Sequence, residues 1–297
     1  MINVALAARS RSMVIFHDPH CAEYSAPGHP ERPARITNTV PRLKDRHPDW
    51  KWRDPRPATE DELLRAHSAD YIASIKNPQG DFDVDTPAYP KIYDYALKSA
   101  GAGIDAARAA LGGESAFALM RPPGHHATCD RAMGFCYFSN IAIAALDALE
   151  NGAERVAIWD FDAHHGNGTE AIIAHNDRIR FASIHQYPAY PGTGTRSFMN
   201  SHNHPVAPGA TRETYRAALT QVLEEIKQFK PDLIAVSAGF DAYRRDPLCD
   251  EPLEAEDFHW LGEKVRSFGV TAFSVLEGGY SNDLPELILA YLKGLNG

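Results

Sequence analysis

Short apolar runs alternate with longer helical segments along this chain of 297 residues, and that alternation strongly restricts the possible folds. The β-rich runs are residues 14–16, 116–120, 156–159, 179–183, 233–236 and 271–276. Amphipathic helical segments are predicted at residues 61–75, 91–111, 140–149, 212–229, 254–268 and 284–295. This order predicts a mainly parallel sheet with helices on both faces. Such sheets build their functional sites at the carboxyl ends of their strands.

The length and a hydrophobic content of 44% fit one large α/β domain. We expect residues 13–297 to form this domain and residues 1–12 to be a loose N-terminal extension. Two segments that are rich in proline and glycine, residues 78–90 and 187–209, are expected to be loops that help to form the site.

A formal net charge of -9 argues against nucleic acid or an anionic membrane as the main partner. No run approaches the ~20 apolar residues of a membrane-spanning helix, and the first residues make a poor secretory signal. The four cysteines show neither CxxC spacing nor the density of a disulfide scaffold. We therefore expect a reducing compartment and a cytoplasmic protein.

Residues 160–168, Asp-Phe-Asp-Ala-His-His-Gly-Asn-Gly, concentrate carboxylates and imidazoles directly after a predicted strand. Side chains two residues apart on an extended strand end point the same way, so Asp160, Asp162 and His164 would share one face. Carboxylate and imidazole groups together suit a divalent transition metal. The pattern is equally typical of a strand end whose carboxylates cap the next helix. The two glycines favour a site loop, because they allow the backbone to turn tightly.

Two other strand ends carry candidate residues. Asp241 follows the run 233–236 and would arrive at the same sheet edge as a third metal ligand, although a lone Asp there is more often a turn residue. Tyr280 follows the run 271–276 and two glycines, so its hydroxyl could donate to a developing oxyanion. A buried core tyrosine is the commoner meaning of such a residue.

The pair His125–His126 follows the run 116–120 and a stiff Arg-Pro-Pro-Gly turn. Adjacent imidazoles near a cation suit general acid and base catalysis, because histidine titrates near neutral pH. Asp160 and Asn167 could each orient one ring. An isolated His-His pair would more often be an incidental surface turn.

Taken together, these motifs resemble the histone deacetylase family, whose fold is shared with the manganese-dependent arginases. The resemblance covers most of the chain and runs through residues 29–33 (HPERP), RPPGHHA, GFCYFSN at 134–140, DFDAHHGNGT, YPGTG at 190–194, SAGFDA and EGGY. It implies a single α/β domain of the arginase/deacetylase type, with a mainly parallel sheet of about eight strands and helices on both faces.

The resemblance also implies a zinc-dependent deacetylase that hydrolyses linear amide bonds. Its implied zinc ligands are Asp162, His164 and Asp241. Its implied catalytic residues are His126 as the general base, His125 as an electrostatic partner held by Asp160, Asn167 as the residue that orients His126, and Tyr280 as the oxyanion donor. Family members also hold K⁺ or Na⁺ beneath the zinc, and the matching positions are Asp160, Asp162, His164, Ser183 and Ile184. Ser183 could instead simply end a buried strand.

By resemblance, a narrow tunnel would receive the acyl-lysine side chain. Its matching residues are Gly134, Phe135, Tyr190 and Leu248, and burial of four methylenes offers ~0.8 kcal/mol each toward binding. Relatives that cleave acetylated polyamines carry a Glu gatekeeper, in one branch at the position of Leu248, so an acyl-lysine peptide or protein fits better. An acidic loop with Asp81, Asp83 and Asp85 could meet a cation or a substrate N–H, and no role is assigned to it.

Two alternatives remain open at this point. One is an amidohydrolase for acetylpolyamine or another small acylated amine, and the other is a catalytically silent acyl-lysine binder. The sequence gives no oligomeric state, and it does not distinguish zinc from Fe²⁺ or Co²⁺, which accept the same ligands.

Overall fold

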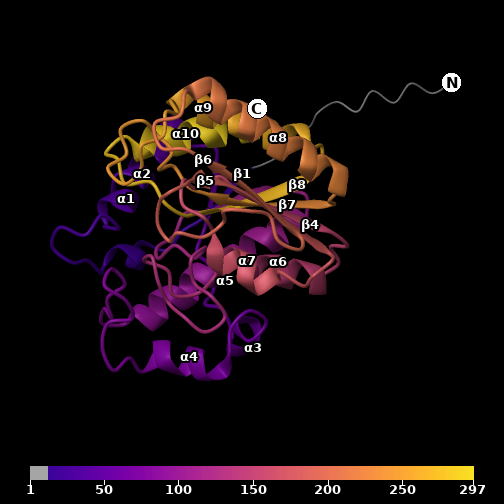
Figure 1. The fold of residues 1–297 in the computed structure, drawn as a ribbon. Coiled ribbons are helices and arrows are strands. Elements are labelled where there is room, and N and C mark those ends of the chain that lie inside the picture. The colour runs from indigo at the N-terminus through magenta and orange to yellow at the C-terminus, as the bar shows by residue number, and fades with distance from the viewer. Residues whose placement is uncertain (1–12) are drawn as a thin grey trace.

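Eight parallel strands form one sheet in the computed structural model, which describes residues 13–297 (Figure 1). The order across the sheet is β2 (Lys51–Arg53), β1 (Met13–Phe16), β3 (Ser115–Ala118), β8 (Thr271–Leu276), β7 (Leu233–Ala238), β4 (Val156–Asp160), β5 (Ile179–Gln186) and β6 (Ser201–Val206). Every neighbouring pair is parallel, as the alternation of apolar runs and helices predicts. The expected extension, residues 1–12, lies outside the described residues.

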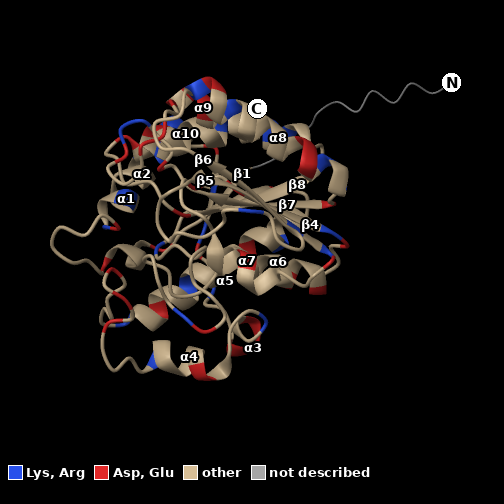
Figure 2. Cartoon of the chain, in the orientation of Figure 1, with Lys and Arg blue, Asp and Glu red and all other residues tan. Residues whose placement is uncertain are grey.

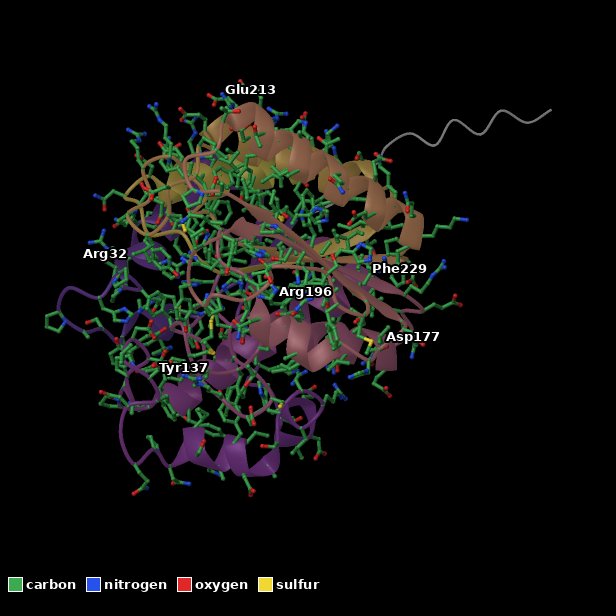
Figure 3. The ribbon with its side chains drawn as sticks, viewed as in Figure 1. Arg32, Tyr137, Asp177, Arg196, Glu213 and Phe229 are labelled. Carbon is green, nitrogen blue, oxygen red and sulfur yellow. The ribbon has the colours of Figure 1, made fainter. Side chains whose placement is uncertain are left out.

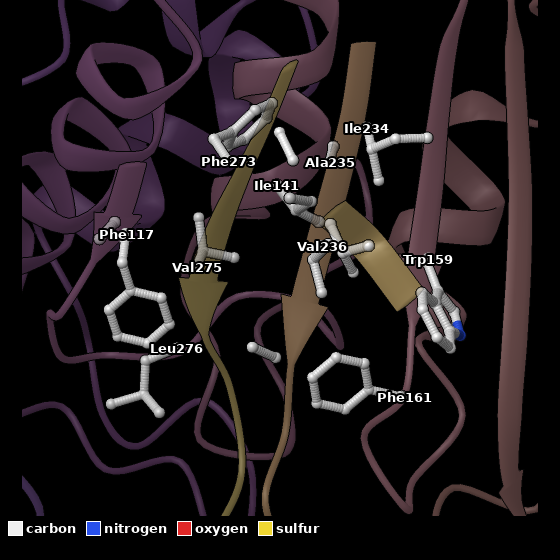
Figure 4. Close-up of a cluster of buried hydrophobic side chains, with 14 of the residues drawn as sticks. Phe117, Ile141, Trp159, Phe161, Ile234, Ala235, Val236, Phe273, Val275 and Leu276 are labelled. Atoms are coloured by element: carbon white, nitrogen blue, oxygen red, sulfur yellow. The ribbon is translucent and has the colours of Figure 1, made fainter. Parts of the chain in front are cut away.

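The central strands are buried on both faces, which explains why they are continuous apolar runs and not alternating ones. Strands β3, β4 and β7 are buried along their whole length. Figure 4 shows side chains from neighbouring strands packed together, among them Phe117, Trp159, Val236 and Phe273. At about 25 cal/mol per Å² of apolar surface, burial on this scale is the main force that holds the sheet together.

The two edge strands were not predicted. β2 carries Lys51 and Arg53, and β6 contains His202, His204 and Pro205. Charged residues and proline are typical of sheet edges, where they prevent pairing with other chains, but they hide the strand signal in a sequence. The prediction that residues 187–209 form a loop is therefore wrong for residues 201–206, which form β6.

Two layers of helices cover the sheet. Figure 1 shows helices α8, α9 and α10 on one face and α5, α6 and α7 on the other. The long helices are α5 (Ile92–Leu111), α6 (Asn140–Glu150), α8 (Arg212–Phe229), α9 (Ala255–Ser267) and α10 (Leu284–Asn296), all close to their predicted bounds. The short elements are η1 (Pro19–Ala22), α1 (Ala34–Thr37), α2 (Thr39–Arg46), α3 (Glu60–Leu63), α4 (Ala69–Lys76) and α7 (Asn167–Ile173).

The single helix expected over residues 61–75 is instead two helices, α3 and α4. Helix α3 begins with a capping box, in which the Thr59 side chain accepts from the N–H of Glu62 and the Glu62 carboxylate accepts from the N–H of Thr59. Ser68 starts α4 by accepting a hydrogen bond from the N–H of Tyr71. A second N-cap inside an apolar periodic stretch ends one helix and begins another.

Charged side chains lie mainly on the outside of the molecule. Figure 2 shows acidic and basic residues along the outward sides of the helices, and Figure 3 shows Glu213 and Asp177 at the periphery. In residues 13–297, no helix combines the length and the apolar character that crossing a membrane requires.

Candidate active site

The four central strands deliver the predicted site residues to one place, just beyond their carboxyl ends. His125 and His126 follow β3, Asp162 and His164 follow β4, Asp241 follows β7, and Tyr280 follows β8. His125 and Tyr280, which are 155 residues apart in the sequence, thus meet at one edge of the sheet. The structure brings together all the residues that were predicted to bind zinc or to catalyse hydrolysis.

Asp162, His164 and Asp241 form a compact group of donor atoms. The Nδ1 atom of His164 lies 2.9 Å from Oδ2 of Asp241 and 3.2 Å from Oδ1 of Asp162. Ligand atoms around a tetrahedral zinc ion at 2.0–2.2 Å are ~3.4 Å apart, so these separations suit an ion bound between the three groups. Backbone N–H groups hold both carboxylates, since Gly278 donates to Asp162 Oδ2 at 2.7 Å and Ala163 donates to Asp241 Oδ1 at 2.7 Å.

The backbone at residue 278 approaches this group too closely for any residue with a side chain. A Cβ atom on Gly278 would lie 2.6 Å from Oδ2 of Asp162, well inside van der Waals contact. The same position donates the N–H that holds Asp162. Gly278, the first glycine of the EGGY segment, is therefore required by the close packing of the backbone against the carboxylates.

The two carboxylates are electrostatically unlike each other. Burial and the adjacent Asp162 carboxylate raise the pKa of Asp241 to about 7. Burial also acts to raise the pKa of Asp162, but the His125 and His164 imidazoles hold it below the ordinary value. A divalent cation between the two groups would offset their repulsion, so the residues present fit a bound metal.

Each ring of the histidine pair has its own hydrogen-bond partner. His125 Nδ1 lies 3.0 Å from Oδ2 of Asp160, and His126 Nδ1 donates to Oδ1 of Asn167 at 2.8 Å. The bond to Asn167 places the proton of neutral His126 on Nδ1 and leaves the lone pair of Nε2 free. Both rings are buried, with 3% and 4% of their surface exposed.

The surroundings of the two histidines give them opposite protonation preferences. Burial opposes a charge on His125, but the Asp162 and Asp160 carboxylates raise its pKa to about 10. Burial lowers the pKa of His126 well below its ordinary value, and the neighbouring His125 and His164 lower it further. At neutral pH, therefore, His125 is cationic and His126 is neutral, which are the two states that acid and base roles require.

A cavity of about 230 Å³ leads to the histidines and the metal-binding group. Its lining residues are Asp85, His126, Gly134, Phe135, His164, Tyr190, Leu248 and Tyr280, which include all four residues predicted for the tunnel. The Phe135 backbone has φ 68°, an uncommon value for a residue with a side chain, and its ring stands edge-on to Tyr280 at 5.7 Å. Tyr190 stands edge-on to His126 at 5.1 Å. An aromatic channel of this kind suits an unbranched aliphatic chain.

The acidic loop does not act as one unit. Asp85 lines the cavity, whereas Asp83 pairs with Arg131 at 3.0 Å and Asp81 accepts from the N–H of Ala88 at 2.8 Å. Only Asp85 of these three carboxylates therefore stands at the cavity.

Ser183 and Ile184, which were predicted to help to hold a monovalent cation, lie on β5 beside the end of β4. Both residues are fully buried, as is Asp160. The Ser183 hydroxyl contacts Nδ1 of His185 at 2.9 Å. The sequence analysis did not include this histidine.

The turn before His125 is fixed by residues whose roles were not predicted. Arg121 is completely buried, and its guanidinium donates to Oε2 of Glu31 at 2.8 Å. The Glu277 carboxylate, also completely buried, accepts the N–H groups of Gly124 at 2.7 Å and His125 at 3.1 Å. The motifs quoted above contain all three of these residues, Glu31, Arg121 and Glu277. Charged residues next to glycine and proline were therefore the sequence feature that could have indicated their structural role.

Cys249 also approaches the metal-binding group and was not predicted. Its sulfur lies 3.4 Å from Nε2 of His164, and His164, Asp241 and Cys249 place donor atoms within 4.8 Å of one another. The same sulfur lies 4.0 Å from Nδ1 of that ring, so it packs beside both ring nitrogens. Burial raises the pKa of the Cys249 thiol to about 12. Cys249 thus contacts the His164 ring next to the metal-binding group. All four cysteines are free of disulfides.

Comparison with known proteins identifies the family of this chain. A family model described as histone deacetylase domain matches residues 29–295. A probable deacetylase of Methanothermobacter thermautotrophicus is 37% identical over 96% of this chain and 91% of its own length. A histone deacetylase-like amidohydrolase of Pseudomonas aeruginosa is 38% identical over 82% of this chain and 70% of its own.

A solved structure agrees as well. The crystal structure of acetylpolyamine aminohydrolase from Burkholderia pseudomallei superposes with a TM-score of 0.89 at 26% identity, over 96% of this chain and 98% of that one. The predicted fold class is thereby confirmed. The chain belongs to the histone deacetylase family, whose members hydrolyse amide bonds.

Proposed function

We propose that this protein removes acetyl groups from the ε-amino group of lysine in peptides or proteins and depends on zinc. The observation that carries this proposal is the placement of His126, bonded to Asn167, and His125, bonded to Asp160, beside Asp162, His164 and Asp241 at the inner end of an aromatic cavity. This arrangement can take a proton from water and return one to an amine. Both steps are needed to hydrolyse an amide.

Asp162, His164 and Asp241 would hold the zinc ion, which when bound polarises the amide carbonyl and lowers the pKa of water. The free Nε2 of His126 takes the water proton while the water oxygen bonds to the carbonyl carbon. Asn167 keeps the His126 ring in the tautomer that this transfer needs.

Tyr280 would stabilise the oxyanion formed by this attack. The residue lines the cavity, and burial raises the pKa of its hydroxyl well above the usual value, so it remains a donor at neutral pH. The C–N bond then breaks, and protonated His126 delivers its proton to the departing amine nitrogen. The products are acetic acid, which ionises to acetate in water, and a free amine, and His126 is neutral again.

A monovalent cation, K⁺ or Na⁺, is part of the same proposal. Support comes from the complete burial of Asp160, since a buried carboxylate is costly without a compensating charge. His125 supplies one positive charge, on the Oδ2 side of Asp160. The dependence of activity on K⁺ or Na⁺ tests this part of the proposal separately from zinc.

A second candidate substrate is an acetylated polyamine or a similar small amine. The Asp85 carboxylate at the cavity favours it, because a distal ammonium group could pair with that charge. The structural relative from Burkholderia pseudomallei is named for that substrate. Against it, Leu248 presents an apolar side chain, 39% exposed, at the same cavity.

The test compares acetate release from an acetyl-lysine peptide and from acetylspermidine, with and without a zinc chelator. Faster chelator-sensitive turnover of the peptide supports the proposal. Faster turnover of acetylspermidine would assign the protein to polyamine hydrolysis. Peptide binding without acetate release would instead indicate a silent acyl-lysine binder. Metal analysis of the purified protein would distinguish zinc from Fe²⁺ or Co²⁺.

A further inference from the structure

The segment that carries Tyr280 has no regular secondary structure, yet side chains hold its backbone on every side. Residues 277–281 follow the end of β8 without entering a helix. The N–H of Gly278 is bonded to Asp162, and the carbonyl of Gly279 accepts from Nε of Arg35 at 2.8 Å. A hydroxyl that must reach a reacting oxygen on such a segment depends on these contacts.

Asp246 supplies the remaining contacts from outside the catalytic group. Its Oδ2 atom accepts the N–H of Tyr280 at 2.7 Å and the N–H of Ser281 at 3.2 Å. Its other oxygen, Oδ1, accepts the N–H of Leu248 at 3.0 Å. The side chain is 7% exposed, so little water is available to replace these bonds.

One carboxylate therefore joins two walls of the cavity. Tyr280 is the proposed oxyanion donor, and Leu248 belongs to a different chain segment that lines the same cavity. Both are held through backbone N–H groups, which cannot rotate away from their acceptor. These bonds thus fix the backbone from which the Tyr280 side chain extends relative to the backbone of Leu248.

We propose that Asp246 is a positioning residue, which fixes the Tyr280 hydroxyl for catalysis and the Leu248 side chain for substrate binding through three backbone hydrogen bonds. The inference rests on the proposed function, because it assigns a reaction step to Tyr280. Asp246 itself touches neither the substrate nor the metal in this scheme.

The different donors on the two oxygens give the isosteric variant a distinct expected effect. In Asp246→Asn, the amide oxygen can still accept from Tyr280 and Ser281, but the NH₂ group then faces the N–H of Leu248, a second donor. We expect KM for the acetyl-lysine peptide to rise at least threefold and kcat to stay within threefold. Asp246→Ala removes all three bonds, and we expect kcat to fall at least tenfold.

A double-mutant cycle separates positioning from a general loss of stability. Asp246→Ala is made alone and together with Tyr280→Phe, and both proteins are assayed well below their melting temperatures. If Asp246 acts through the Tyr280 hydroxyl, Asp246→Ala should lower kcat less than threefold once that hydroxyl is absent. An equal loss in both backgrounds would overturn the inference.

Asp257 on helix α9 offers a control for the loss of a buried carboxylate. It is completely buried, accepts the N–H of Glu254 at 2.8 Å and pairs with Arg212 and Arg216, but it does not line the cavity. Asp257→Ala should lower the melting temperature and leave kcat within twofold in both backgrounds.

If Asp246→Ala does not fold, the kinetics of Asp246→Asn test the inference instead. The inference is refuted if Asp246→Asn leaves both kcat and KM unchanged, or if it lowers kcat and leaves KM unchanged. The proposed function fails in a different way. In that case the unmodified protein releases no acetate, or Tyr280→Phe leaves kcat unchanged.

Discussion

Replacing Asn167 by aspartate tests whether neutral His126 is the general base. The Oδ1 atom of Asn167 lies 2.8 Å from Nδ1 of His126, and a carboxylate there would favour the imidazolium form. At a charge separation of ~4 Å and an effective dielectric constant of ~20, the attraction is ~4 kcal/mol, or ~3 pKa units. Desolvation of a third carboxylate near Asp160 and Asp162 offsets part of this, so we expect the pKa of His126 to rise by ~1–2 units.

The sign of the effect on activity follows from the role of the base. His126 accepts a proton only when it is neutral, and burial together with the neighbouring His125 keeps its pKa well below the ordinary value. The acid limb of kcat/KM against pH reports this group in the free enzyme. Asn167→Asp should move that limb upward by ~1–2 pH units, so that activity falls on the acid side of the profile and is retained at high pH.

Asn167→Ala is the matched control, because the bond from His126 to Asn167 raises the pKa of His126. Loss of that bond should lower kcat and shift the acid limb downward or leave it in place. A limb that stays fixed in Asn167→Asp, or moves upward equally in both variants, would refute the assignment of His126 as the base.

Three further predictions concern the metal, the cavity and the buried ion pair. His126→Ala should nearly abolish turnover but retain zinc, whereas Asp241→Ala should lose turnover and zinc alike. Acetate release and metal analysis measure these two effects. Full zinc occupancy in Asp241→Ala would contradict the assignment of Asp241 as a ligand. Gly134→Ala should lower kcat/KM by ~100-fold, because Gly134 has φ +56° and a Cβ there would lie 2.5 Å from the His126 ring. Circular dichroism should show that the fold is intact. Unchanged kinetics would show that the cavity adapts to the added methyl group. Arg121→Met should cost ~3 kcal/mol of unfolding free energy in urea denaturation, because it leaves the buried Glu31 carboxylate with only Arg35, at 3.3 Å, as a charged partner. The added change Glu31→Gln should recover part of that loss.

The sequence predicted the central sheet well because its strands are short, apolar and separated by long helices. β7 and β8 lie where the apolar runs were found, since burial on both faces leaves little room for polar residues. β6 was missed because an edge strand needs a polar face toward solvent, and the polar and proline residues 202–205 resemble a loop. Composition alone does not distinguish an edge strand from a loop.

The candidate site was predictable where its chemistry is local in sequence. Asp162 and His164 stand two residues apart on a strand end, so a short motif carries most of the metal-binding group. The residues that hold this group in place gave a weaker signal. Asp246, for example, accepts hydrogen bonds from backbone N–H groups 34 and 35 residues away. Every residue except proline has such an N–H group, so no sequence pattern indicates which ones Asp246 binds.

The strand order also has a consequence for synthesis of the protein. β8, the last strand to leave the ribosome, pairs with β3 on one side and β7 on the other in the middle of the sheet. Until residue 276 has emerged, the nascent chain can form only two separate half-sheets, one with β3 and one with β7 at an open, apolar edge. Such edges invite pairing with other chains, so this protein should depend on chaperones most strongly in the last stage of its translation.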